Sequence, residues 1–255
     1  MILAALATCL VTACAGVSTP VVVGPLPQAR EVVKRLNARR TAVRSFVMQG
    51  QISLVYPDGE LYGDHLIQGV YPDHLRADIM GPFGRPVMSL ATDGRRLTVL
   101  LFRENKAFQG PATRQNLGRF LGIPMSPAEI YALITGNPPL VVYQEATVVR
   151  AAGGGAQLKL LASGGAVGQG IDFDPTDYTV TSAWLRVIDG PVALRATYSD
   201  FQPWQGARYP RQAELRDSQG RTLTLQNDEM DLNRAVSGQL FTLRPPAAMK
   251  LEPLP

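Results

Sequence analysis

The sequence predicts a mainly β, α+β protein in which a strongly bent antiparallel sheet carries helices on its concave side. Three observations support this prediction: about a dozen short runs alternate apolar and polar residues, turn residues separate the runs, and three segments have helical periodicity. The chain has 255 residues, 45% hydrophobic and 18% charged, so it can bury one sizeable core. We expect residues 28–244 to form this domain.

The first residues have the pattern of an export signal. Ile2 to Thr12 is an apolar run of signal-core length that is too short to cross a bilayer. No Lys or Arg precedes it, as a signal peptide normally requires, which suggests a start codon further upstream. We expect residues 1–13 to be removed on export.

The run ends in Val11-Thr12-Ala13-Cys14, which resembles the lipobox of bacterial lipoproteins. The resemblance implies that Cys14 becomes the mature N-terminus and carries diacylglyceryl and N-acyl lipid. Residues 14–27 would then be the lipidated N-terminus and a flexible linker, since Ala15 to Pro27 is Pro, Gly, Val and Thr without period. Ala15 is not the aspartate that commonly retains such proteins at the inner membrane, so the family pattern implies the outer membrane, facing the periplasm. Cys9 lies in the removed segment, which leaves no thiol to pair.

An amphipathic helix is predicted over residues 28–43. Ala29, Val32, Val33, Leu36 and Val43 share one face, and Arg30, Lys34, Arg35 and Arg39 share the other. Such a helix more often packs on a sheet than lies on a membrane.

The period then switches from helical to two, which predicts strands. Expected strands are 46–56, 61–71, 74–80, 86–92, 96–102 and 105–110 in the first half, and 142–149, 156–162, 168–174, 178–188, 191–199, 207–216 and 221–232 in the second. The turn Pro57-Asp58-Gly59 separates the first two. We expect the tail, residues 245–255, to be loose.

Two helices divide the strands. The first is expected over residues 113–121. The second begins with Ser126 as a hydroxyl N-cap, Pro127 at the first helical position and Glu129 at the third, and Gly136 closes it. If the helices fill the hollow of the curled sheet incompletely, an apolar cavity suited to acyl chains remains.

Candidate catalytic and metal-binding residues are scarce. His65 and His74 have no zinc-ligand spacing and are expected to be ordinary surface or turn histidines. The glycines at 153–155 and from 164 to 170 lack the setting of a phosphate loop and are interpreted as hairpin turns. Asp172, Asp174 and Asp177 lack the glycine and distal glutamate of a calcium loop, so a polar turn is expected.

These absences, together with a missing Gly-x-Ser-x-Gly elbow, disfavour an enzyme. No metal is expected, and no cofactor beyond the lipid on Cys14. The formal net charge is +4, but the basic residues are scattered and the compartment is extracytoplasmic, which argues against nucleic acid. Mild attraction to anionic headgroups and an ordinary solvated surface both stay open.

Several motifs, in order along the chain, resemble the LolB family of outer-membrane receptors, which take lipoproteins from the periplasmic carrier LolA. Residues 75–84 are similar to that family's strand and Gly-Pro-Leu-Gly loop, and the similarity continues through Leu121–Met125, Ile130–Pro138 and Tyr209–Leu215. The resemblance implies an unclosed antiparallel barrel of about eleven strands with helices lidding an apolar cavity. It further implies binding of lipoprotein acyl chains and release into the outer membrane.

The loop Gly81-Pro82-Phe83-Gly84 is the candidate contact with membrane or cargo. In the LolB family the leucine at the position of Phe83 protrudes and assists membrane insertion. From the sequence, Phe83 either caps one end of the core or is held out in solvent.

Two functional hypotheses follow. The first is a monomeric lipid-binding or lipoprotein-receptor protein without enzymatic activity, whose partners are membrane lipid, lipoprotein cargo and a LolA-like carrier. The second is an interaction module of an envelope assembly whose cavity is packed shut. The volume of the cavity distinguishes them.

Overall fold

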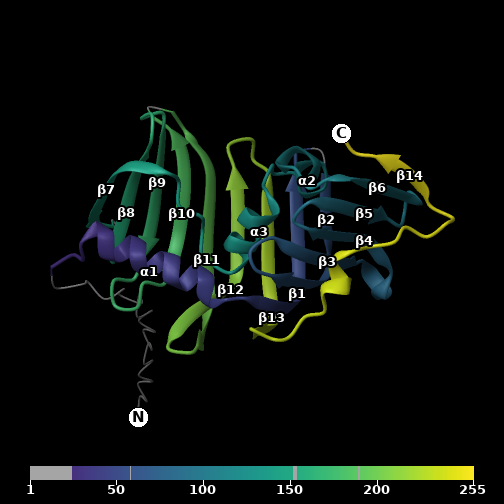
Figure 1. Cartoon of the computed structure of the whole chain (residues 1–255), viewed down its shortest axis with the longest axis horizontal. Helices are drawn as coiled ribbons and strands as arrows, with labels where there is room; N and C mark the ends of the chain where they lie inside the picture. Colours follow the sequence, from purple (N-terminus) through teal and green to yellow (C-terminus); the bar gives the residue numbers. More distant parts are fainter. Residues whose placement is uncertain (1–24, 58, 152–153, 189) are drawn as a thin grey trace, which may run out of the picture.

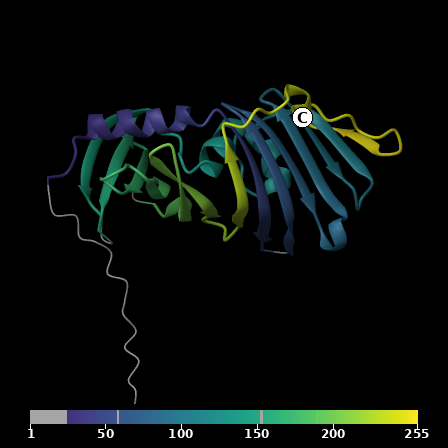
Figure 2. The same cartoon turned by 90° about the horizontal axis from the view of Figure 1, so that it is seen from below.

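The computed structural model describes residues 25–57, 59–151, 154–188 and 190–255. The predicted export signal, Cys14 and most of the linker fall outside these ranges. The described residues build one sheet of fourteen strands, and three α-helices lie on the same side of it (Figures 1 and 2).

Helix α1 (Ala29–Ala42) confirms the predicted amphipathic segment. Val32 and Leu36 are buried beneath it, as the periodicity requires. Arg39, expected on the polar face, is also buried, because its guanidinium reaches backbone carbonyls under the helix. Figure 1 shows α1 crossing the half of the sheet that contains β7 to β11.

The N-terminal half is an antiparallel meander. Its strands are β1 (Ser45–Tyr56), β2 (Gly59–Val70), β3 (His74–Met80), β4 (Pro86–Asp93), β5 (Arg96–Leu101) and β6 (Lys106–Pro111), and the 3₁₀ turn η1 (Pro82–Gly84) joins β3 to β4. Alternate residues such as Met48, Ile67 and Ile79 are buried on the side that faces the helices, which we call the inner face.

Helices α2 (Arg114–Leu121) and α3 (Pro127–Ile134) follow. The predicted capping box is confirmed, since the Ser126 hydroxyl accepts from the Glu129 N–H and the Glu129 carboxylate accepts from the Ser126 N–H. Gly136 follows the helix at φ 69°, in the left-handed region that favours glycine.

The C-terminal half is a second meander. Its strands are β7 (Tyr143–Arg150), β8 (Ala156–Ala162), β9 (Val167–Phe173), β10 (Val180–Val187), β11 (Val192–Trp204), β12 (Ala207–Asp217) and β13 (Thr222–Leu232). The two meanders join where β1 pairs with β13, with Phe46 opposite Leu232. The spatial order runs from β14 through β6 to β1, then from β13 down to β7, and the two end strands do not pair, so the barrel is unclosed as predicted.

The C-terminal tail differs from the prediction. After the 3₁₀ turn η2 (Gly238–Phe241), β14 (Lys250–Pro253) pairs in parallel with β6. It adds one strand to those expected from the alternation, and the sheet has fourteen strands rather than the roughly eleven that the family resemblance implies. Leu254 is buried and its N–H donates to the carbonyl of Gln109 at 2.7 Å, while Asn116 donates to the Pro255 carbonyl at 2.8 Å. The sequence does not predict this strand, because a segment of four residues, with prolines and one buried leucine nearby, shows no alternation of apolar and polar residues.

Candidate functional site

Helices α2 and α3, with the loop between them, cover the inner face of the sheet and form what we call the lid, residues 114–134. Tyr131 of α3 is fully buried against Phe46, with ring centroids 5.1 Å apart. Its hydroxyl donates to the carbonyl of Val43 at 3.1 Å, and burial raises its pKa. Tyr131 therefore fixes one side of the lid onto the start of β1.

Beneath the lid, three small cavities of about 70, 20 and 50 Å³ follow one another across the inner face. The Met125 side chain borders all three. Leu133 separates the first two, and Ile130 and Ile134 border the second and third. The cavities therefore form a row whose partitions are side chains of the lid.

The walls of the row are almost entirely apolar. The sheet contributes Ala183, Ala196 and Leu215 to the first cavity, Tyr198, Leu223 and Leu225 to the second, and Ile52, Ile67, Leu75, Ile79, Met88 and Leu90 to the third. The polar sheet residues of the lining are Gln169 in the first cavity and Glu214 in the second. Such a lining suits hydrocarbon and offers little to a polar substrate.

The row is too narrow to hold a ligand in this conformation. Sites that hold small molecules usually measure roughly 300 to 1,000 Å³, well above any of the three cavities. Methionine is flexible and fills irregular gaps, so Met125 is a partition that can move without unfolding the helices. An acyl chain would need Met125 to swing aside or the lid to lift.

An ion pair borders the end of the row nearest β10. Arg114, at the start of α2, forms an ion pair with Glu129 of α3, and both border the 70 Å³ cavity. Glu129 is also the capping residue of α3, so one carboxylate holds both helices. Arg114 is 61% exposed, and the pair contributes little stability on its own.

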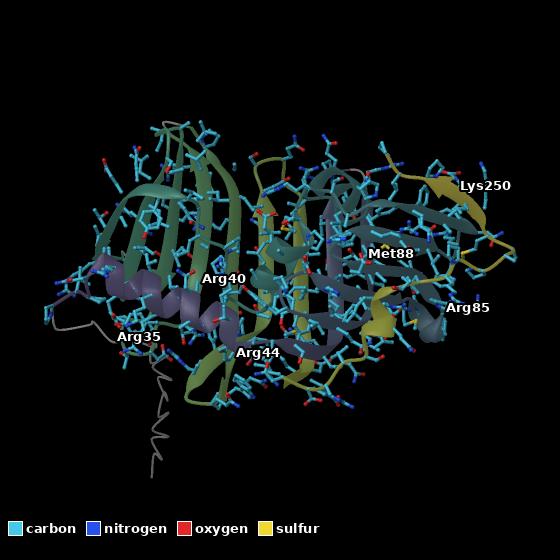
Figure 3. The ribbon with its side chains drawn as sticks, viewed as in Figure 1. Arg35, Arg40, Arg44, Arg85, Met88 and Lys250 are labelled. Carbon is cyan, nitrogen blue, oxygen red and sulfur yellow. The ribbon has the colours of Figure 1, made fainter. Side chains whose placement is uncertain are left out.

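The loop 81–84 lies at the rim of the sheet. Phe83 is fully exposed, at 100% of its surface, and has φ 64°, an unusual conformation for a non-glycine residue. The Gly81 N–H donates to the Arg85 carbonyl at 2.8 Å and closes the loop. Figure 3 labels Arg85 at the edge of the molecule remote from the start of α1. The possibility that Phe83 caps the core is therefore wrong.

The exposed Phe83 borders an open hollow of about 310 Å³ together with Tyr62 of β2, which is itself 62% exposed. Ile52 borders this hollow and also the 50 Å³ cavity under the lid. The rim loop thus lies near one end of the row, a proximity that no pattern in the sequence indicates.

The two histidines occupy different environments. His74 is partly exposed beside Asp73, with 3.0 Å between Nδ1 and Oδ1, as expected of a turn residue. His65 was expected at the surface, but only 3% of it is exposed. Alternation along β2 explains the difference, because His65 and Ile67 point to the same inner face. Among the described residues no cluster of His, Cys, Asp and Glu has the makings of a metal site.

The aspartates near residue 175 are held by a cation of the chain itself. Arg208 donates to Asp174 and to Asp177, each at 2.7 Å. Although burial favours the neutral acid, these bonds and the Thr179 N–H hold the pKa of Asp177 below its usual value. Asp172 instead accepts from Gln157 and Ser182. The polar-turn interpretation of this segment is confirmed for Asp174 and Asp177, whereas Asp172 lies in β9.

The glycine-rich stretches are only in part turns. Gly154 and Gly155 join β7 to β8, and Gly164 and Gly165 join β8 to β9, all with positive φ. Gly168 and Gly170, also predicted as turn residues, lie inside β9. At Gly170 any side chain would collide with the Trp184 indole, so this glycine makes room for a neighbouring aromatic.

Across the described ranges, no helix combines the length and the apolar character that a membrane crossing requires.

The sequence matches no protein-family model and no curated protein.

Three solved structures share the fold. A LolA superfamily protein from Nitrosomonas europaea has a TM-score of 0.56 at 16% identity, covering 85% of this chain and 98% of that one. A putative outer membrane lipoprotein-sorting protein domain from Vibrio parahaemolyticus has a TM-score of 0.57 at 10% identity, covering 83% and 94%. A DUF1329 family protein from Desulfovibrio piger has a TM-score of 0.57 at 10% identity, covering 84% and 97%. The chain therefore has the fold of the LolA superfamily, as its motifs suggested.

Proposed function

We propose that this protein is a non-enzymatic lipoprotein of the bacterial envelope that binds lipid or lipoprotein acyl chains between its lid and its sheet. The observation that carries the proposal is the row of three apolar cavities partitioned by Met125 and its neighbours. The lipoprotein-sorting description of the Vibrio structure with the same fold supports this choice of ligand.

Acyl chains can supply the free energy that opening the row requires. Each methylene removed from water contributes about 0.8 kcal/mol, so a chain of a dozen or more carbons outweighs the rearrangement of a few lid side chains. The Arg114–Glu129 pair is exposed enough to break at small cost. Binding therefore proceeds by shifting the lid rather than by filling a preformed pocket.

The proposed setting is the periplasmic face of the outer membrane, with lipid on Cys14 as the anchor. Phe83 then serves as the contact with membrane or cargo, because a fully exposed aromatic at the rim can enter the headgroup region. A LolA-like carrier and lipoprotein cargo are the proposed partners, and the protein acts as a receptor that helps to localise lipoproteins.

One observation favours a second function. The row is narrow, and the largest of its three cavities is about 70 Å³, as expected if the domain serves only as an interaction module of an envelope assembly. In that case the lid never opens to hydrocarbon.

Titration of the mature, unlipidated chain (residues 15–255) with an uncharged dansyl-labelled undecyl chain, N-undecyl dansylamide, distinguishes the two functions. We expect saturable binding with a fluorescence increase. Met125→Trp fills the partition of all three cavities and should weaken binding at least tenfold. Met249→Trp, a substitution of the same type near the C-terminal strand, should leave binding unchanged.

Met125→Ala covers the case in which the larger residue disturbs the fold. This variant removes the partition and should bind the probe at least as tightly as the wild type. Absence of saturable binding by the wild type and by Met125→Ala would overturn the acyl-binding proposal and favour the interaction module.

A further inference from the structure

A polar pair interrupts the apolar inner face beside the third cavity. In the register of the sheet, Gly50 of β1 lies opposite His65 of β2 on one side and opposite Asn227 of β13 on the other. All three positions belong to the inner face, and Gly50 places no side chain between its neighbours. With strands about 4.8 Å apart, the two polar residues are attached roughly 10 Å apart across the glycine.

Both side chains are buried with polar atoms that lack partners. His65 is 3% exposed, and neither of its ring nitrogens makes a hydrogen bond of good geometry among the described residues. The Met48 backbone carbonyl lies near the ring but does not meet that geometry. Asn227 is 1% exposed, and its Nδ2 donates to the Arg211 carbonyl at 3.0 Å, but its Oδ1 has no partner in the described chain. Folded proteins satisfy nearly all buried polar atoms, so two such residues flanking one glycine call for an explanation.

His65 is neutral at physiological pH. Burial lowers its pKa to about 4, and this effect outweighs the Asp228 and Asp64 carboxylates and the Met48 carbonyl, which all favour the charged ring. A neutral imidazole offers one N–H donor and one acceptor, and Asn227 Oδ1 adds a second acceptor. Together the pair presents a donor and acceptors without net charge.

The pair adjoins the proposed acyl site. Ile67, the next inner-facing residue of β2, and Ile79, opposite His65 on β3, both border the 50 Å³ cavity. Leu225, the next inner-facing residue of β13 before Asn227, borders it as well. If an acyl chain entered beneath the lid, a polar linkage that it carried would therefore come within reach of His65 and Asn227.

We propose that His65 and Asn227 bind the neutral linkage of an acyl group, an amide or ester, with the imidazole N–H donating to the ligand carbonyl and Asn227 Oδ1 accepting from an amide N–H. This inference rests on the proposed acyl-binding function and specifies its ligand class. A free carboxylate would bring an unpaired charge into a buried site, so the pair favours linked acyl chains over fatty-acid anions.

Competition against the dansyl probe tests the pair at pH 7.5 with N-methyl-lauramide and n-dodecane, which differ only in the polar linkage and its methyl group. In the mature chain we expect the amide to compete well. His65→Leu should weaken competition by the amide roughly tenfold, the loss of about one hydrogen bond, while competition by dodecane stays unchanged. His74→Leu, the same substitution at the other histidine, should change neither.

A second measurement needs no variant. In nitrogen-15 NMR of the wild-type histidines, N-methyl-lauramide should shift the ring resonances of His65, whereas dodecane should not. If amide and alkane give the same shifts and His65→Leu competes like the wild type, the pair holds buried water only and the inference is overturned while acyl binding stands. If no acyl probe binds the wild type at all, the proposed function itself fails.

Discussion

Arg39 Nη2 on α1 donates a hydrogen bond to the backbone carbonyl of Arg208 at 2.6 Å and so joins the first helix to the start of β12. The guanidinium is 5.0 Å from the centre of the Tyr209 ring, and burial lowers its pKa. The Arg208 side chain in turn holds Asp174 and Asp177. One buried cation therefore fixes the position of α1 over the C-terminal half of the sheet.

Replacing Arg39 by Ala should lower the free energy of unfolding by about 2 kcal/mol, because a charge-assisted hydrogen bond is lost and the Arg208 carbonyl is left unpaired. Arg30→Ala is the matched control, since Arg30 is exposed on the same helix and its loss should cost less than about 0.5 kcal/mol. Urea unfolding measures both. Equal effects of the two substitutions would show that Arg39 does not hold the helix.

Gly136→Ala should destabilise the fold by roughly 1 to 3 kcal/mol. The residue has φ 69°, and a Cβ there would lie 2.6 Å from Cδ of Pro210 on β12. Gly59→Ala, at the β1–β2 turn with open space around it, is the control and should change little. Thermal melting of both variants decides, and an unchanged melting temperature for Gly136→Ala would contradict the close packing of this turn.

The buried His65 predicts a pH-dependent stability. Its pKa is about 4 in the folded chain against 6.5 for an unperturbed histidine, so below pH 6.5 the unfolded chain takes up the proton first. The contribution of the neutral His65 to the free energy of unfolding should be fully present above pH 6.5. It should decrease by roughly 3 kcal/mol as the pH drops to about 4.

The variant His65→Leu should lack this part of the pH dependence. Urea unfolding of wild type and variant at pH 7 and pH 4.5 gives the difference directly. Parallel losses of stability in the two proteins would mean that His65 is already protonated or hydrated in the folded state.

Phe83→Glu should leave the melting temperature almost unchanged, because the side chain touches no core residue and surface substitutions usually cost less than about 0.5 kcal/mol. Binding of the unlipidated chain to liposomes should weaken, by the roughly 1 to 2 kcal/mol that one inserted apolar side chain provides. Val187→Glu, an exposed apolar position in the other half of the sheet, should not alter liposome binding. Undiminished binding by Phe83→Glu would remove the rim loop from the site.

Cys14→Ser should abolish lipid labelling and release the protein from the membrane fraction, because acyl chains supply the apolar burial that holds a lipoprotein in place. Metabolic labelling with palmitate followed by fractionation tests this. Continued labelling of the variant would place the acyl group elsewhere in the chain.

Local signals in the sequence predict the helices and most strands. The box of Ser126, Pro127 and Glu129 places the start of α3 to the residue, because capping depends only on neighbours within one turn. The alternation of β2 also predicts the burial of His65, because it assigns His65 to the same face as the apolar Ile67. The expectation of a surface histidine overlooks this pattern. The burial of His65 can therefore be predicted from the sequence.

Features that depend on contacts between distant segments of the chain cannot be predicted from local sequence patterns. The narrowness of the row depends on how Met125 fits against strands from both meanders, which no local pattern indicates. The pairing of β14 rests on one buried leucine, Leu254, near the end of the chain. The sequence does not determine the exposure of Phe83, because a loop of glycine and proline permits either orientation of the aromatic ring.

The pairing of β1 with β13 also determines the order of assembly. Phe46 meets Leu232 only after nearly the whole chain has been synthesised, so β1 has no neighbour on that side while the residues in between emerge. Contacts between such distant residues slow folding, and an unpaired strand invites aggregation meanwhile. A chaperone that shields β1 should therefore raise the yield of folded protein more than one that acts on either meander after it has formed.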